Sequence, residues 1–182
     1  MITIIVVVVL VGILVLWAVS VQNKLVKADE ISKNALRQIN VQQMSRFDAI
    51  KAIVKLAREY ATHESETLKS VIESRRVTSN PSPTVEDIAR NEENLKAITE
   101  QINAVVENYP DLKANQVYIK SMDDIKNYEE NVRLARMTFN DTITRFNNQV
   151  RMFPGSLIAG LLGFSAKEYL PEESSKADFP EI

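Results

Sequence analysis

The sequence predicts an all-α protein in which an N-terminal transmembrane helix precedes an elongated antiparallel three-helix bundle with a short C-terminal helical cap. Three observations predict this fold class. The run from Ile2 to Val21 carries no charge, neither glycine nor proline occurs between Gly12 and Pro81, and later apolar residues recur every three or four positions. Such spacing places side chains on one face of a helix. We expect an anchor at residues 1–22, a helical bundle at 23–164 and an acidic, mobile tail at 165–182.

The uncharged run predicts contact with a membrane through residues 2–21. About 20 apolar residues in a helix match the ~30 Å hydrocarbon core of a bilayer. A cleaved signal peptide is the alternative reading, because Ala18 to Ser20 resembles a small-residue cleavage site. No basic residue precedes the run, however, and signal peptides have shorter apolar regions. Trp17 suits the membrane interface.

The charges that flank the span predict its orientation. Lys24, Lys27 and Lys33 follow the apolar run closely, whereas no lysine or arginine precedes it. Basic residues near a span favour the cytoplasmic side. We therefore expect a single-pass protein of the cell membrane whose helical domain lies in the cytoplasm.

The first predicted helix leaves the membrane without a local breaker and carries an apolar stripe further along. The stripe comprises Phe47, Ile50, Val54, Ala57, Ala61, Leu68 and Val71. Pro81 and Pro83 then interrupt helical continuation, so residues 77–84 are predicted to form a loop.

Two further helices follow. Thr84 with Asp87 three residues later is typical of an N-terminal cap, and Pro110 ends the second helix and starts the third. The seam of the second helix is Ile88, Leu95, Ile98, Ile102, Val105 and Tyr109. The third helix is predicted from about Asp111 to Phe153. Because the connections are short, we expect neighbouring helices to pack antiparallel.

Several motifs in order resemble those of the LemA family of bacterial membrane proteins. They are "NKLVKADE", "RQINVQQMSRFDAI", "YATHE", "NYPDLKAN", "YEENVRLARMTFND" and the spaced pattern "FP....IAG..GF...YL". The chain departs from the family pattern at Ile50 to Ile53, where many members have Ile-Pro-Asn-Leu. The resemblance implies a helical domain tethered by an N-terminal span. It also implies a role in envelope assembly and, as a partner, a membrane zinc protease encoded beside some members.

The residue inventory predicts no catalytic, cofactor-binding or metal-binding residue. The chain has no cysteine and one histidine, and no glycine-rich phosphate loop is present. A metal-dependent regulator or enzyme that uses His63 and the acidic helix faces is the alternative. Its carboxylates would be Glu64, Glu66, Asp123, Asp124, Glu129 and Glu130. A net charge of −2 argues against nucleic acid as a partner.

The unequal lengths of the second and third helices predict an interaction surface. At 1.5 Å per residue the third helix exceeds the second by roughly 27 Å, which leaves an apolar overhang at the membrane-distal end. The candidate residues are Phe146, Val150, Phe153, Leu157, Ile158, Leu161, Leu162 and Phe164. Either these residues form a cap, or the overhang binds a protein partner or a second copy. The predicted function is a membrane-anchored helical scaffold or adaptor.

Overall fold

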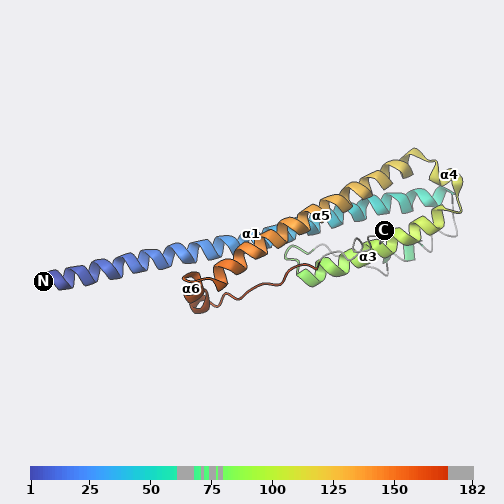
Figure 1. Ribbon diagram of the computed structural model, residues 1–182. Coiled ribbons are helices and arrows are strands. Elements are labelled where there is room, and N and C mark those ends of the chain that lie inside the picture. Colours follow the sequence, from blue (N-terminus) through green and yellow to red (C-terminus); the bar gives the residue numbers. More distant parts are fainter. Residues whose placement is uncertain (61–67, 71, 74–76, 78–79, 172–182) are drawn as a thin grey trace, which may run out of the picture. The chain divides into compact units, whose positions relative to one another are not determined.

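The computed structural model describes residues 1–60, 68–70, 72–73, 77 and 80–171. Within them the chain forms α1 (Ile2–Tyr60), α3 (Val85–Val106), α4 (Pro110–Lys113), α5 (Gln116–Arg151) and α6 (Gly155–Leu162), with no strand (Figure 1). Two compact units divide the chain. The first comprises Met1–Asp29 and Asn140–Ile182, and the second comprises Glu30–Phe139. The all-α prediction is confirmed.

Helix α1 carries the apolar N-terminal run. Every residue from Ile2 to Trp17 is exposed. Among the described residues one helix is long and apolar enough to cross a membrane, with a mean hydropathy of 3.3 in its most apolar stretch and none of that stretch buried. Because no proline occurs in α1 and its last glycine is Gly12, the backbone hydrogen bonds continue without a local breaker to Tyr60.

The core of the second unit lies among α1, α3, α4 and α5. Its fully enclosed members include Ile50 and Ile53 of α1, Ile98 and Ile102 of α3, and Leu112 of α4. Ile125 of α5 belongs to the same apolar cluster. The described members of the predicted stripes therefore lie in or against the core, with Val105 and Tyr109 only partly buried, and Ala61 and Val71 lie outside the described residues. Burial of the core side chains supplies the main driving force for this unit.

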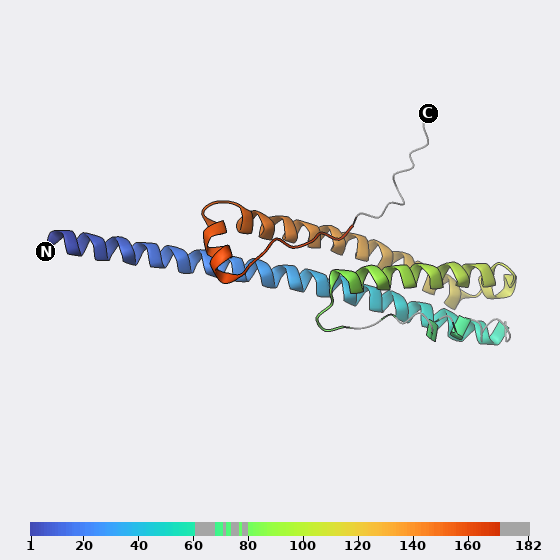
Figure 2. The ribbon, with the colours of Figure 1, turned by 90° about the horizontal axis from the view of Figure 1, so that it is seen from below.

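Helices α1 and α3 run in the same direction, which differs from the expected antiparallel packing. Asn40 Nδ2 donates to the Asn80 carbonyl at 3.2 Å, and Gln43 Nε2 donates to the Ile88 carbonyl at 3.0 Å, so partner numbers rise together along both helices. Figure 2 shows the same arrangement. The expectation was wrong because Asn80, which precedes α3, lies beside Asn40, so that α3 begins next to the earlier part of α1 in this unit.

Helix α5 runs against α1 in this unit. Arg46 of α1 pairs with Glu129, whereas Tyr60, further along α1, accepts a hydrogen bond from the earlier residue Asn115 at 2.9 Å. The predicted third helix is also divided in two. Asn115 Oδ1 accepts from the Val117 amide at 2.8 Å and so caps α5 separately from the single turn of α4.

The predicted cap of the second long helix is confirmed. The Thr84 hydroxyl accepts from the Asp87 amide at 3.0 Å, and the Asp87 carboxylate accepts from the Thr84 amide at 3.1 Å. The Thr84 backbone hydrogen bond is the largest of the causes that lower the pKa of Asp87 below its ordinary value of 3.8. The Thr84 and Asp87 backbone amides at the start of α3 are therefore hydrogen-bonded by side chains from the same turn.

Candidate functional site

The predicted interaction surface lies in the unit formed by Met1–Asp29 and Asn140–Ile182, and part of it is covered. Phe146 is fully buried. The Phe164 ring meets it edge to face, with centroids 6.0 Å apart, and the Lys167 ammonium lies 4.7 Å from the centre of the Phe146 ring. These contacts are of the kind that stabilise aromatic side chains beyond area burial alone. Phe146 is thus covered by the chain's own C-terminal segment.

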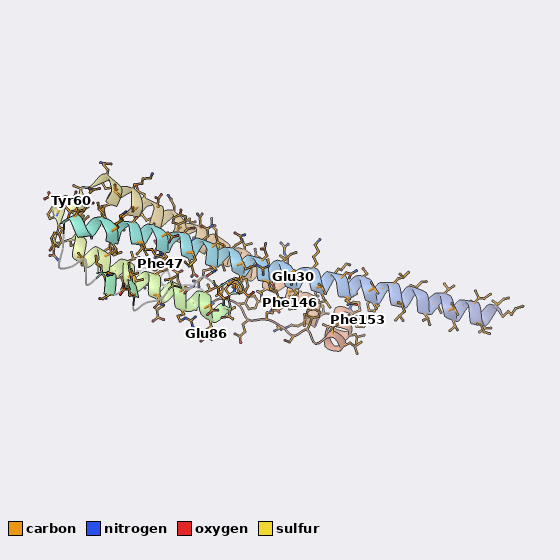
Figure 3. The ribbon with its side chains drawn as sticks, turned by 180° about the vertical axis from the view of Figure 1, so that it is seen from behind. Glu30, Phe47, Tyr60, Glu86, Phe146 and Phe153 are labelled. Atoms are coloured by element: carbon orange, nitrogen blue, oxygen red, sulfur yellow. The ribbon has the colours of Figure 1, made fainter. Side chains whose placement is uncertain are left out.

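The other candidate residues leave apolar surface in water around α6. Phe153 is 80% exposed, Leu157 59% and Leu161 84%. Leu162 is also exposed, whereas Val150 and Ile158 are half-buried. Figure 3 labels Phe146 in α5 and Phe153 at the turn into α6. Among the candidate residues, the exposed apolar surface is therefore concentrated on α6 and on Phe153 in the turn before it.

Two glycines fix the position of α6. A Cβ atom at Gly155 would lie 2.3 Å from the Gln149 carbonyl oxygen, so only glycine allows α6 to approach the end of α5 this closely. At the other end, Gly163 adopts a left-handed conformation with φ of 75° and caps the helix. Ala159 is buried on the inner side of α6. This short helix is consequently held against its own unit.

A C-terminal strap, defined here as residues 164–171, follows α6 and is bound by two asparagines of α5. Asn147 donates to the Lys167 carbonyl at 2.9 Å and accepts from the Lys167 amide at 2.8 Å. Asn140 makes the same pair of bonds with Leu170, at 3.1 and 3.0 Å. Each side chain thus replaces the partner that a neighbouring strand would supply to an extended backbone.

Sequence reasoning missed the strap. The acidic tail was predicted to begin at residue 165, yet the backbone of Lys167 and Leu170 is bound to α5. The available signal was the recurrence of asparagine at positions 140 and 147, which lie on the same helix face because they are two turns apart. Residues 172–182 of the predicted tail lie outside the described residues.

An apolar groove of about 430 Å³ lies beside the exposed surface of α6. One wall is formed by α1 residues Trp17, Val21, Lys24 and Leu25, and the other by Asn148, Gln149, Met152, Phe153, Pro154 and Gly155. The groove therefore lies at the end of the uncharged run of α1.

The prediction that this surface lies at the membrane-distal end was wrong. It followed from the assumption that α1 and its successor are antiparallel, which would send the third long helix away from the membrane. The structure instead places Phe153 across the groove from Trp17.

A second polar cluster lies in the Glu30–Phe139 unit. Arg46 is 1% exposed, and its guanidinium donates to Glu92 at 2.7 Å and to Glu129 at 2.5 Å. Gln43 donates to the same Glu92 carboxylate at 3.0 Å. These three side chains and Glu129 tie α1, α3 and α5 together, and they neutralise a charge that is costly to bury alone.

Two acidic residues of the metal-binding alternative, Glu129 and Glu130, form ion pairs with different arginines. Glu129 pairs with Arg46, and Glu130 pairs with Arg133 through two guanidinium nitrogens at 2.8 and 2.5 Å. Within the described part of the chain, no group of three or more His, Cys, Asp or Glu residues could hold a metal ion. His63, Glu64 and Glu66 lie outside the described residues.

Comparison with known proteins identifies the family. The model of the LemA family matches residues 35–182. The chain is also similar to Protein LemA of Metamycoplasma hominis, with 24% identity over 149 residues that cover 82% of this chain and 68% of that protein. The matched region includes most of α1 after the apolar run, the Arg46 cluster, α6 and the strap. Since the family model spans well over half of the sequence, the chain belongs to the LemA family.

Proposed function

We propose that this protein is a single-pass, membrane-anchored scaffold or adaptor of the bacterial cell envelope that acts by binding other proteins or copies of itself. The observation that carries the proposal is the continuity of α1, which extends from Ile2 to Tyr60. Its first part exposes an uncharged, predominantly apolar set of side chains, and its later residues Ile50 and Ile53 belong to the packed core of the second unit. A helix that carries both segments links a folded domain to the bilayer.

The proposed anchor has side chains suited to a membrane boundary. Trp17 lies near the end of the apolar run, and the exposed residues Lys24 and Lys27 follow within the next three turns. An aromatic ring and lysine ammonium groups in this order favour the region of the lipid headgroups. The same lysines support a cytoplasmic position for the helical domain.

We favour binding over catalysis because several charged side chains in the described part of the chain form ion pairs with one another. Arg46 binds Glu92 and Glu129, and the exposed pairs Arg90–Asp87 and Arg133–Glu130 lie within single helices. Such pairs organise helix faces and do not present a reactive group to a substrate. Exposed Leu134 and Met137, one turn apart on α5, offer apolar contact area for a partner.

Topology is tested by reporter fusions after Ile182 in a bacterial host. A cytoplasmic reporter should be active and alkaline phosphatase, which needs export, should be inactive. The opposite pattern would reverse the proposed orientation. Recovery of both reporters only in the soluble fraction would remove the anchor from the proposal.

Partner binding is tested by photo-crosslinking from Leu134 and, as a control at an exposed charged position about two turns earlier on the same helix, from Lys126. We expect discrete adducts in native membranes from the leucine position only, and the membrane zinc protease and a second copy of this chain are the adducts to be sought first. Identical, diffuse labelling from both positions would contradict a specific scaffold. Stoichiometric zinc or manganese in the dialysed protein would instead favour the metal-dependent alternative.

A further inference from the structure

Helix α6 and the residues around it form an uncharged segment with an exposed apolar face. No charged residue occurs between Arg151 and Lys167. Phe153, Leu157 and Leu161 are spaced four residues apart and are 80%, 59% and 84% exposed. Leu157 and Leu161 lie one turn apart on one side of α6, Phe153 lies in the turn before the helix, and Ala159 is buried on the inner side. Large side chains with such exposure mark a contact surface rather than a core.

The position of α6 relative to α1 indicates what covers this face. The groove that leads into α6 is lined by Trp17 and Val21 of α1, which belong to the last part of the uncharged run. If that run spans the bilayer, Phe153 lies at the depth where the hydrocarbon core meets the headgroups. The exposed apolar face is thus continuous with the surface of α1 that already meets lipid.

The orientation and length of α6 suit the same environment. In both ribbon views α6 lies steeply across the direction of the first part of α1 (Figures 1 and 2). Its eight residues span only about 12 Å, which is too short to cross a bilayer. A helix that lies across a membrane span, with one apolar face, matches the geometry of an interfacial helix.

Cationic groups flank this apolar face. Lys24 lines the groove, Lys27 follows it one turn later on α1, and Arg151 ends α5 just before Met152. All three side chains are exposed. Ammonium and guanidinium groups beside a face of this kind are complementary to phosphate headgroups, whereas a purely apolar protein partner would leave them unmatched.

We propose that Phe153, Leu157 and Leu161 insert into the lipid leaflet next to α1 and give the protein a second membrane contact. This inference rests on the proposed anchoring by α1. The second contact holds the end of α5 at the bilayer surface, so that the unit formed by Met1–Asp29 and Asn140–Ile182 is attached through two elements. The strap then leaves the membrane surface along α5, with Lys167 bound to Asn147.

The test uses the full chain, which contains no cysteine. Three single variants, Leu161→Cys, Leu14→Cys and Met137→Cys, are labelled with an environment-sensitive fluorophore and reconstituted at low density into liposomes of phosphatidylethanolamine and phosphatidylglycerol. Lipids that carry a nitroxide at a shallow or a deep acyl position serve as quenchers. Leu14 reports the span, and Met137, which is 56% exposed on α5, is the matched apolar control.

We expect the label at Leu161 to lose most of its emission with the shallow quencher and less with the deep one. The label at Leu14 should be quenched most strongly by the deep quencher, and the label at Met137 by neither. If Leu14 is quenched and Leu161 is not, the inference fails while the anchor stands. If Leu14 is not quenched either, the proposed anchoring itself fails.

A second measurement separates lipid from protein as the covering partner. The unlabelled Leu161→Cys variant is oxidised in the same liposomes at increasing protein density. Little disulfide-linked dimer is expected, because a side chain buried in lipid does not meet a second copy. Efficient dimer formation without lipid quenching would show that another copy of the chain covers α6 and would overturn the proposal.

Discussion

Replacement of Arg46 by methionine tests how the three long helices of the second unit are held in register. Methionine keeps the aliphatic volume but removes the guanidinium that donates to Glu92 and Glu129. The Glu92 side chain is only 17% exposed and would keep the hydrogen bond that Gln43 Nε2 donates to it. Removing one partner of a buried ion pair typically costs 3–5 kcal/mol, because the other charge remains desolvated.

The structure places the expected cost near the lower end of that range. Gln43 still satisfies part of the Glu92 carboxylate, and Glu129 is 49% exposed and returns to water. We therefore expect a loss of about 3 kcal/mol for Arg46→Met, which is roughly a hundredfold change in the unfolding equilibrium. Glu129→Gln should cost no more than about 1 kcal/mol, since half-exposed ion pairs contribute little.

The assay is urea unfolding of the full chain in detergent micelles, followed by far-ultraviolet circular dichroism. The apolar part of α1 adds a constant background, because its hydrogen bonds are satisfied within the helix and shielded by detergent. For a slope of about 1.5 kcal/mol per molar urea, the midpoint of Arg46→Met should fall by about 2 M. Each variant is compared with wild type in the same detergent.

A double variant decides whether the reasoning is correct. In Arg46→Met with Glu92→Met, no unpaired charge remains in the core, and stability should return to within about 1 kcal/mol of wild type. Gln43 keeps its bond to the Ile88 carbonyl in this variant. A cost below about 1 kcal/mol for Arg46→Met, or a double variant as unstable as the sum of its single changes, would refute the interpretation.

Further substitutions test three features: the cap of α3, the strap and the turn into α6. Thr84→Ala should lower stability by about 1 kcal/mol at neutral pH. Because the folded-state pKa of Asp87 is lowered, its contribution is present above its ordinary pKa and is lost as the pH falls through the lowered value, so wild type and Asp87→Asn should converge in acid. Asn147→Ala should speed amide hydrogen exchange throughout the strap, which an unchanged exchange rate would contradict. Gly155→Ala should displace α6 and expose its amides to exchange, whereas Gly160→Ala, whose Cβ would meet no atom within 4 Å, should leave the pattern as it is.

The sequence determined the features that depend on neighbouring residues. The uncharged run of α1, the absence of breakers after Gly12 and the spacing of Ile88, Leu95, Ile98 and Ile102 sufficed for helices and core faces. The Thr84 cap was equally accessible, since its partner is three residues away. Local backbone geometry and side-chain periodicity decide such features, and both depend on residues that are close together in the sequence.

Tertiary structure alone decided helix direction and the burial of polar groups. Connection lengths did not reveal that α1 and α3 are parallel, because an intervening segment can return before the next helix begins. From the sequence, no role was assigned to Arg46 or Asn147, and each is buried with a partner from elsewhere in the chain: Glu92 for the first and Lys167 for the second. The free energy of burying a polar group depends on whether such distant partners reach it, which no local pattern records. For the same physical reason, the apolar face of α6 could be found in the sequence, but its position beside Trp17 could not.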